Sequence, residues 1–142
     1  LEHIHDAQAF LEAVLYHLKP SGWLFINVPA LNLLWSEYDL LQNHFRRYSR
    51  TMMQQALQGH MLAIHDMRYW GFCLLPLGIM RKLLISNNTS PEIILEKGFK
   101  MPNDWLNTCF LTIMRLETTL MKKPLLGTSL MTTAVKVASS VE

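Results

Sequence analysis

The chain has 142 residues, of which 50% are hydrophobic and 17% are charged, and its formal net charge is +2 at pH 7. This composition is typical of one globular domain and excludes an intrinsically disordered chain. The small net charge and the lack of a long basic cluster argue against nucleic acid as a partner. Cys73 and Cys109 are too few and too isolated for a disulfide framework or a zinc–thiolate site, so they indicate reduced thiols and a cytoplasmic protein.

The first thirty residues predict a loop, a helix, a tight turn and a strand. Asp6 is placed to cap the helix, because a short carboxylate accepts hydrogen bonds from the free N–H groups of a first turn. Residues 19–22, Lys-Pro-Ser-Gly, end the helix. Residues 23–28 form a short apolar run that favours a strand buried on both faces of a parallel sheet. The helix carries an apolar stripe at helical spacing, formed by Phe10, Leu11, Val14, Leu15 and Leu18.

The segment 33–48 follows this strand and combines aromatic and polar side chains. Open α/β sheets bind ligands outside the carboxyl ends of their strands, so the segment is a candidate substrate-facing lid. The same composition also fits a surface loop whose aromatic residues anchor it to the core. Ser49 then predicts the start of a short helix over 50–58, which ends before Gly59.

Residues 61–69 predict another strand, and residues 70–80 are strongly apolar. Eleven residues are too short to span a bilayer, which needs about 20, and Pro76 with two glycines argues against one stable helix. The segment 70–80 is interpreted either as a buried crossover or as a half-exposed apolar surface. In the second case it meets a membrane or a lipid-like substrate, with Arg81 and Lys82 at the headgroups.

The last third of the chain begins with a polar break over 86–90, and residues 91–102 fit either a short helix or an exposed connection. Asn103 or Asp104 then caps a long helix whose wide apolar face predicts packing against the core. Residues 129–137 alternate and are rich in β-branched side chains, which predicts a final strand.

Several of these stretches, in this order, resemble the C-terminal portion of a class I S-adenosylmethionine-dependent methyltransferase of the type 11/12 kind. They are Leu-Glu-His-Ile-His-Asp at 1–6, Leu-Lys-Pro-Ser-Gly-Trp at 18–23, Leu-Phe-Ile-Asn-Val-Pro at 24–29 and His-Phe-Arg-Arg-Tyr at 44–48. The resemblance implies an α/β fold that is the C-terminal part of a Rossmann-like sheet. It would contain strands five, seven and six with flanking helices, and the last strand would lie antiparallel between the other two.

The resemblance also divides the chain. Residues 1–142 would be a single partial methyltransferase domain, with a loop, helix and strand in 1–30, a substrate-facing loop and short helix in 31–60, and the C-terminal strands and long helix in 61–142. No G-x-G-x-x-G run occurs, so the main S-adenosylmethionine pocket is expected in a missing N-terminal half. Without a fourth strand, strand 23–28 would have an unpaired edge, which predicts self-association.

The resemblance places Leu1 and Glu2 beside S-adenosylmethionine. It makes His3 the catalytic candidate, because histidine accepts a proton near neutral pH and can serve as a base for a substrate hydroxyl. The substrate is expected to be a small-molecule or lipid-like methyl acceptor, with peripheral membrane contact as a further expectation. Its candidate binding residues are Trp35, His44, Arg46, Arg47 and Tyr48.

Adjacent arginines seldom point the same way, so one of Arg46 and Arg47 is expected to bind structure and the other the acceptor. A guanidinium group suits a phosphate or carboxylate on the acceptor. The alternative is that one of them pairs with Glu37 or Asp39 and fixes the loop.

Metal binding is the less favoured interpretation. Glu2 and His3 resemble a pair that binds magnesium in ubiquinone-pathway O-methyltransferases together with an upstream carboxylate, but magnesium prefers oxygen ligands. The grouping of His3, His5 and Asp6 fits an exposed polar loop better than a zinc site. We therefore expect no metal ion. The functional alternative is a non-catalytic remnant or interaction module that does not bind the cofactor alone.

Overall fold

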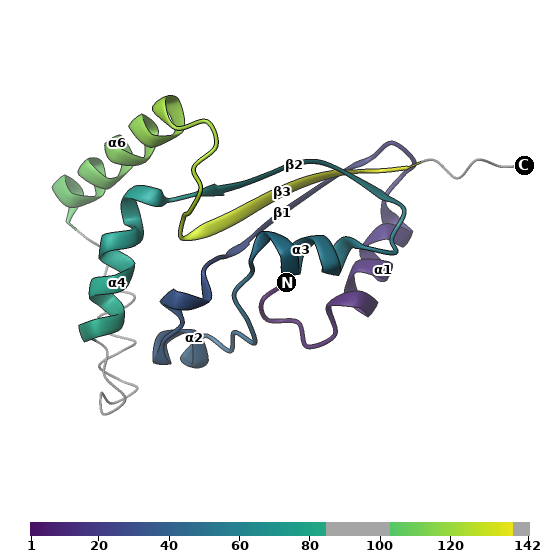
Figure 1. Ribbon diagram of the computed structural model, residues 1–142, viewed down its shortest axis with the longest axis horizontal. Coiled ribbons are helices and arrows are strands. Elements are labelled where there is room, and N and C mark those ends of the chain that lie inside the picture. Colours follow the sequence, from purple (N-terminus) through teal and green to yellow (C-terminus); the bar gives the residue numbers. More distant parts are fainter. Residues whose placement is uncertain (85–102, 138–142) are drawn as a thin grey trace, which may run out of the picture.

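The structure is a computed structural model that describes residues 1–84 and 103–137 (Figure 1). It contains a three-stranded sheet made of β1 (Trp23–Pro29), β2 (Leu62–Trp70) and β3 (Ser129–Lys136). The strand order is β1-β3-β2, and β3 is antiparallel to both neighbours. The mixed α/β architecture and the position of the last strand between the two earlier ones were predicted correctly. The alternatives for residues 91–102 lie outside the described residues.

Helices α1 (Ala7–His17) and α3 (Arg50–Leu57) lie together on one side of the sheet (Figure 1). Leu130 on β3 is paired with Val28 on β1 and with Tyr69 on β2. All three side chains are buried and belong to the layer below the sheet. Burying such aliphatic and aromatic groups is the main source of stability in a domain of this size. The core cluster contains Leu11, Val28, Ala30, Tyr48, Met53, Leu57, Tyr69 and Leu130.

The three predicted helix caps are confirmed, because each depends only on local sequence. Asp6 accepts a hydrogen bond from the backbone N–H of Ala9 at 3.0 Å. Ser49 does the same for Met52 at 3.1 Å, and Asn103 caps α6 (Asp104–Leu120). Caps of this kind stabilise a helix by about 1 kcal/mol each.

The prediction that residues 23–28 are buried on both faces is wrong. Val28 is buried on the helix-covered side, whereas Trp23, Phe25 and Asn27 alternate with the inward residues and are exposed. Phe25 is 69% exposed. The reason is that the neighbour of β1 is antiparallel, and the described helices cover only one face of the sheet. Antiparallel sheets tolerate one open face, and the open face here combines polar side chains with the exposed aromatic residues of β1.

Residues 72–80 are helical and do not form a buried crossover, whereas Trp70 ends β2 and Gly71 lies between the two elements. The 3-10 helix η2 (Phe72–Leu74) leads into α4 (Leu75–Leu84), so the expectation that Pro76 prevents a helix is also wrong. Pro76 occupies the first turn, where its missing N–H is not needed. Gly78 lies against Leu34 of η1 (Asn32–Leu34), and an added Cβ would come within 3.4 Å of that side chain.

The other interpretation of residues 70–80, a half-exposed apolar surface, is confirmed in its exposure. Met80 is 50% and Leu83 78% exposed. The two cations beside them are not free to face lipid headgroups, however. Arg81 stacks over the ring of Tyr38 at 4.2 Å, and Lys82 donates to the carbonyl of Leu33 at 2.6 Å. None of the described helices has the length and apolarity that crossing a bilayer requires.

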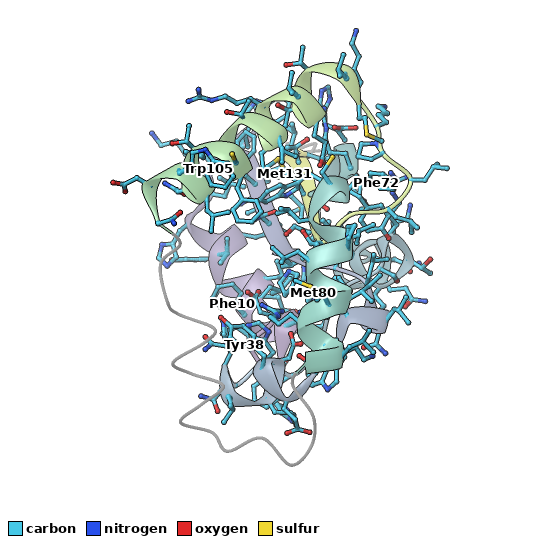
Figure 2. The ribbon with its side chains drawn as sticks, turned by 90° about the vertical axis from the view of Figure 1, so that its left-hand side faces the viewer. Phe10, Tyr38, Phe72, Met80, Trp105 and Met131 are labelled. Atoms are coloured by element: carbon cyan, nitrogen blue, oxygen red, sulfur yellow. The ribbon has the colours of Figure 1, made fainter. Side chains whose placement is uncertain are left out.

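Helix α6 does not pack its apolar face into the core, contrary to the prediction. Trp105, Leu116 and Leu120 are 71%, 54% and 77% exposed, and Figure 2 shows Trp105 on α6 at the surface above α4. The attachment of α6 is polar instead. Its buried Glu117 accepts hydrogen bonds from consecutive backbone N–H groups at the start of η2.

The end of the described chain is joined to its first helix. Lys136, the last residue of β3, donates from its Nζ to the carbonyl of Leu15 at 2.6 Å and to that of Leu18 at 2.8 Å. A cation there complements the helix dipole and adds a partner for two carbonyls at the end of α1, of which that of Leu15 also accepts from the N–H of Leu18. The contact therefore connects the first and last thirds of the chain.

Candidate functional site

The candidate site lies at the carboxyl end of β1. Segment 43–48 is held there because the backbone N–H of Tyr48 donates to the carbonyl of Pro29 at 2.8 Å. Arg47 adds a bond from Nη1 to the carbonyl of Ala30 at 3.1 Å. Ala30 and Tyr48 also form an isolated parallel bridge, so this segment extends the sheet at the end of β1.

Segment 1–6 is joined to segment 43–48 by backbone carbonyl groups. Phe45 donates its N–H to the carbonyl of Glu2 at 2.8 Å. The Nη2 atom of Arg46 donates to the carbonyls of His5 at 2.8 Å and Ile4 at 3.4 Å. These bonds bring together two of the motifs on which the resemblance depends, although they are about forty residues apart in the sequence.

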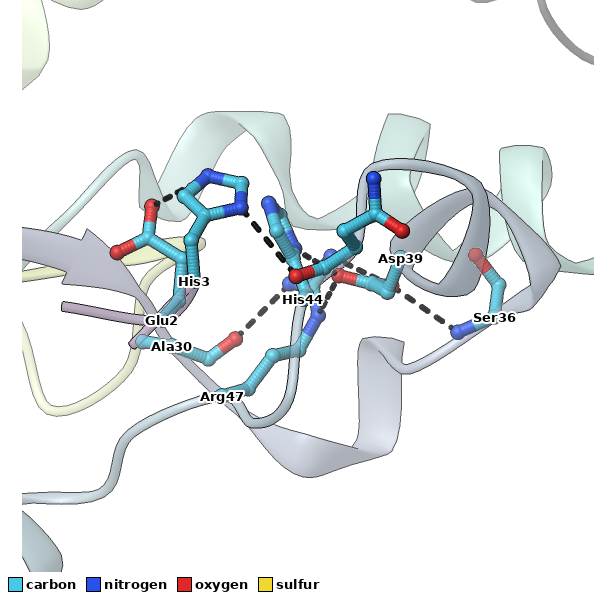
Figure 3. A network of polar contacts seen from close by, with 8 residues as sticks. Glu2, His3, Ala30, Ser36, Asp39, His44 and Arg47 are labelled. Carbon is cyan, nitrogen blue, oxygen red and sulfur yellow. Dashed lines mark hydrogen bonds and ion pairs between the residues drawn. The ribbon is translucent and has the colours of Figure 1, made fainter. Parts of the chain in front are cut away.

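Asp39 is the centre of the polar network in Figure 3. It lies in α2 (Glu37–Leu41) and is fully buried. Its Oδ1 accepts from Arg47 Nε at 2.9 Å and its Oδ2 from Arg47 Nη2 at 3.1 Å, which is a two-pronged contact. The backbone N–H of Ser36 and the Nδ1 of His44 reach the same carboxylate at 3.1 and 3.0 Å.

This network decides the roles that the sequence left open for the two arginines. Arg47 pairs with Asp39 and fixes the loop, so the expectation that it binds substrate is not supported by its position. Arg46 bonds to the carbonyls of segment 1–6 and is half-buried. From the sequence, Asp39 was expected only as one of two alternative partners for an arginine of this segment. Its burial was not visible there, because acidic residues in loops are usually exposed.

A second cluster contains Glu2, His3 and His44. The His3 Nε2 lies 3.7 Å from Glu2 Oε1, and the two imidazole rings meet edge to face at 4.6 Å between centroids. His3 is half-exposed, whereas the side chains of Glu2 and His44 are 18% and 14% exposed. Burial raises the pKa of the Glu2 carboxyl, but hydrogen bonds from its own backbone and the Leu1 amino group outweigh burial. The pKa is therefore lower than usual, which favours the carboxylate.

A pocket of about 450 Å³ opens between residues 5–8, residues 46–48 and α3, and none of Glu2, His3 and His44 lines it. Of the predicted substrate-binding residues, Arg46 and Tyr48 line it, whereas Trp35, His44 and Arg47 do not. Burial raises the pKa of the Tyr48 hydroxyl, which has no hydrogen-bond partner among the described residues. The part of the pocket wall that α3 forms was not predicted, because Met52 and Gln55 belong to no recognisable sequence motif. The complete lining is His5, Asp6, Ala7, Gln8, Arg46, Tyr48, Met52, Gln55 and Ala56.

Leu1 and Glu2, the predicted cofactor contacts, do not line this pocket. The Leu1 side chain packs against the core, and its amino group donates to Glu2 Oε2 at 3.1 Å. Trp35 is half-buried at the end of η1, in the segment that leads into α2. The predicted residues are thus divided among the polar network, the pocket and the His3–His44 cluster.

Comparison with known proteins adds no assignment. No family model, no curated protein and no solved structure matches this chain.

Proposed function

We propose that this chain is the acceptor-binding part of an S-adenosylmethionine-dependent methyltransferase that acts on a small or lipid-like molecule. One observation carries the proposal: the two motif segments 1–6 and 43–48 meet at the carboxyl end of β1. Ligands of open α/β sheets bind at that end. The sheet order β1-β3-β2, with an antiparallel central strand, is also the order that the resemblance implies.

The pocket supplies the acceptor site in this proposal. Its volume of about 450 Å³ lies within the range of small-molecule sites, about 300–1,000 Å³. Arg46 offers a guanidinium group for an acidic group on the acceptor, and Met52 and Ala56 offer apolar contact. An acceptor with one anionic and one apolar end fits this lining best.

His3 is the proposed base. Its Nδ1 lies 3.3 Å from the carbonyl of Asn43, which fixes the ring and makes Nε2 the nitrogen that accepts a proton. The side chain is half-exposed, so an acceptor hydroxyl can reach it. Its role is to take the proton of that hydroxyl as the oxygen attacks the methyl group.

The described residues do not form a cradle for S-adenosylmethionine. Leu1 packs against the core, and the Glu2 carboxylate faces the Leu1 amino group and His3. We propose that the cofactor binds mainly to residues other than those described, and we derive no step through it. When bound, it would supply the methyl group.

Calorimetric titration with S-adenosylmethionine tests this proposal. The chain alone should bind weakly, and a chain that includes any residues its coding sequence places before Leu1 should bind clearly. With the extended chain, transfer of a labelled methyl group to lipid and small-molecule extracts should fall about 100-fold or more in His3→Ala. His17→Ala, at an exposed histidine on α1, is the matched control. Absence of binding by both chains would reject the proposal.

A non-catalytic interaction module is the second candidate, and the exposed apolar faces favour it. Phe25 on β1, Leu83 on α4 and Leu120 on α6 are each more than two-thirds exposed. Large exposed apolar surfaces mark binding to other proteins or membranes. Peripheral membrane contact through α4 belongs to this candidate, and the same titration separates it from catalysis, because a module of this kind binds no cofactor.

A further inference from the structure

We propose that Glu2, His3 and His44 form a binding site for a divalent transition-metal ion of the Zn²⁺ type. One ligand atom from each side chain lies within 4.8 Å of the other two. Two imidazoles and one carboxylate form the three-residue ligand set of many catalytic zinc sites, which keep a fourth position open for water or substrate.

The distances are close to those of a bound site. Ligand atoms about 2.0–2.1 Å from a tetrahedral zinc ion lie about 3.3 Å apart. His3 Nε2 and Glu2 Oε1 are already 3.7 Å apart. The widest pair, at no more than 4.8 Å, needs to close by at most about 1.5 Å. A change of this size lies within the range of small side-chain adjustments in the cluster.

Both imidazoles are oriented by a second acceptor, which is the strongest support for the site. The Nδ1 of His44 lies 3.0 Å from the buried Asp39 carboxylate, and the Nδ1 of His3 lies 3.3 Å from the carbonyl of Asn43. Each contact keeps the proton on Nδ1 and leaves the lone pair on Nε2. Metal-binding histidines are oriented in this way by carboxylates and backbone carbonyls. Figure 3 shows the two rings between Glu2 and Asp39.

The backbone holds this arrangement before any ion arrives. Asn43 has φ +55°, a left-handed conformation that asparagine tolerates. The turn is closed by the N–H of His44, which donates to the carbonyl of Asp39 at 2.9 Å. The bond from Phe45 to Glu2 joins the other ligand segment at 2.8 Å. The site therefore loses little conformational entropy on binding.

The ligand chemistry selects the ion. Mg²⁺ and Ca²⁺ take oxygen ligands, and this cluster offers only one carboxylate. Imidazole nitrogen suits Zn²⁺, Co²⁺ and Ni²⁺, and zinc also binds sets that combine imidazole nitrogen with carboxylate oxygen. The partly buried Glu2 carboxylate, whose pKa is lowered, remains charged and balances part of the charge of the ion.

The metal site does not depend on methyl transfer. If both proposals hold, Glu2, His3 and His44 would hold the ion, and the ion would supply a water of near-neutral pKa that could serve as the base in place of a free His3. If the metal binds and S-adenosylmethionine does not, the metal site stands alone. Zn²⁺ binding is therefore measured directly, without an activity assay.

The test is a calorimetric Zn²⁺ titration of the whole chain after treatment with a chelator. We expect one ion per chain, and at least about 100-fold weaker binding in His3→Ala and in His44→Ala, as befits loss of a ligand. His17→Ala is the matched control and should bind as the unchanged chain does. Circular dichroism checks folding, since His44→Ala also loses the bond to Asp39, whereas the half-exposed His3 can be truncated without that loss.

His44→Ala is the decisive variant. A chelate made by the Leu1 amino group and His3 alone does not need His44, so unchanged Zn²⁺ affinity in a folded His44→Ala chain would overturn the proposal. The absence of stoichiometric binding by the unchanged chain would overturn it as well. Visible absorption of bound Co²⁺ that changes in both His3→Ala and His44→Ala would support it.

Discussion

At the scale of single residues, the buried pair of Asp39 and Arg47 holds the site together. The pair joins α2 to segment 43–48 and, through the Arg47 bond to Ala30, to the end of β1. Asp39 also orients His44. A buried charge pair is costly to break from one side, because the remaining charge stays buried without its partner.

Asp39→Asn should therefore lower the free energy of unfolding by about 3–5 kcal/mol, as measured by urea denaturation. The amide keeps the shape of the side chain but leaves the Arg47 guanidinium without its counter-charge. Asp66→Asn is the control, because both ion-pair partners of Asp66 are exposed, Arg68 at 48% and Lys123 at 72%. That change should cost less than about 1 kcal/mol. Equal losses in the two variants would contradict the assigned role of Asp39.

The sequence did not predict which side chains of the site are buried. Segment 33–48 was correctly placed after a strand, because a strand must be followed by a connection. Which arginine points inward depends on where the carboxylate of Asp39 lies in space. The contact between His3 and His44 likewise depends on the turn at Asn43 and on the packing of α2, and neither leaves a pattern in the sequence.

At the scale of elements, Glu117 connects α6 to the start of η2. Its Oε1 accepts from the N–H groups of Gly71 at 2.7 Å and Phe72 at 3.0 Å, and its Oε2 from that of Cys73 at 2.8 Å. Gly71 has φ +76°, which turns these N–H groups toward one point. Burial raises the pKa of Glu117, but the three hydrogen bonds outweigh burial and leave its pKa below the usual value.

A lowered pKa in the folded state gives a pH dependence of defined sign. The contribution of Glu117 to stability is fully present above the unfolded-state pKa and is lost as the pH falls through the lower folded-state pKa. We expect Glu117→Gln to be about 2 kcal/mol less stable at neutral pH and to lose less stability than the unchanged chain on acidification. Urea unfolding between neutral pH and about pH 3 measures this. Glu12→Gln, on the exposed side of α1, should leave the pH profile unaltered.

The sequence predicted the elements better than their surroundings. Caps at Asp6, Ser49 and Asn103 depend on a few neighbouring residues, and all three are confirmed. The burial of β1, α4 and α6 depends on what covers them. The apolar patterns of β1 and α6 were interpreted as core faces, and that of α4 as either a buried crossover or a half-exposed surface. The interaction that does attach α6 is a single buried carboxylate, which an apolar periodicity cannot reveal.

At the scale of the whole molecule, apolar surface and an open strand edge occur together. Within the described residues β1 pairs only with β3, so its other edge offers unpaired backbone groups. Trp23 and Phe25 stack beside each other on the open face of that strand. Edges of this kind recruit other chains.

We expect the chain to self-associate at high concentration, and sedimentation velocity over a concentration series measures this. Phe25→Lys should shift the equilibrium toward monomer, because a charge on an edge strand opposes pairing. Tyr16→Lys, at an 84% exposed position on α1, is the matched control and should have no effect. A single monomeric species at every concentration would contradict the prediction.

The central position of β3 determines when the protein can acquire its structure during synthesis. Strands β1 and β2 do not pair with each other, so within the described part of the chain neither has a strand partner until residues 129–136 have left the ribosome. The Lys136 contact with Leu15 spans 121 positions of the chain, which makes it one of the least local contacts that the fold contains. Contacts this distant slow the folding reaction, and the nascent chain must keep its apolar strands from other molecules until β3 has been translated.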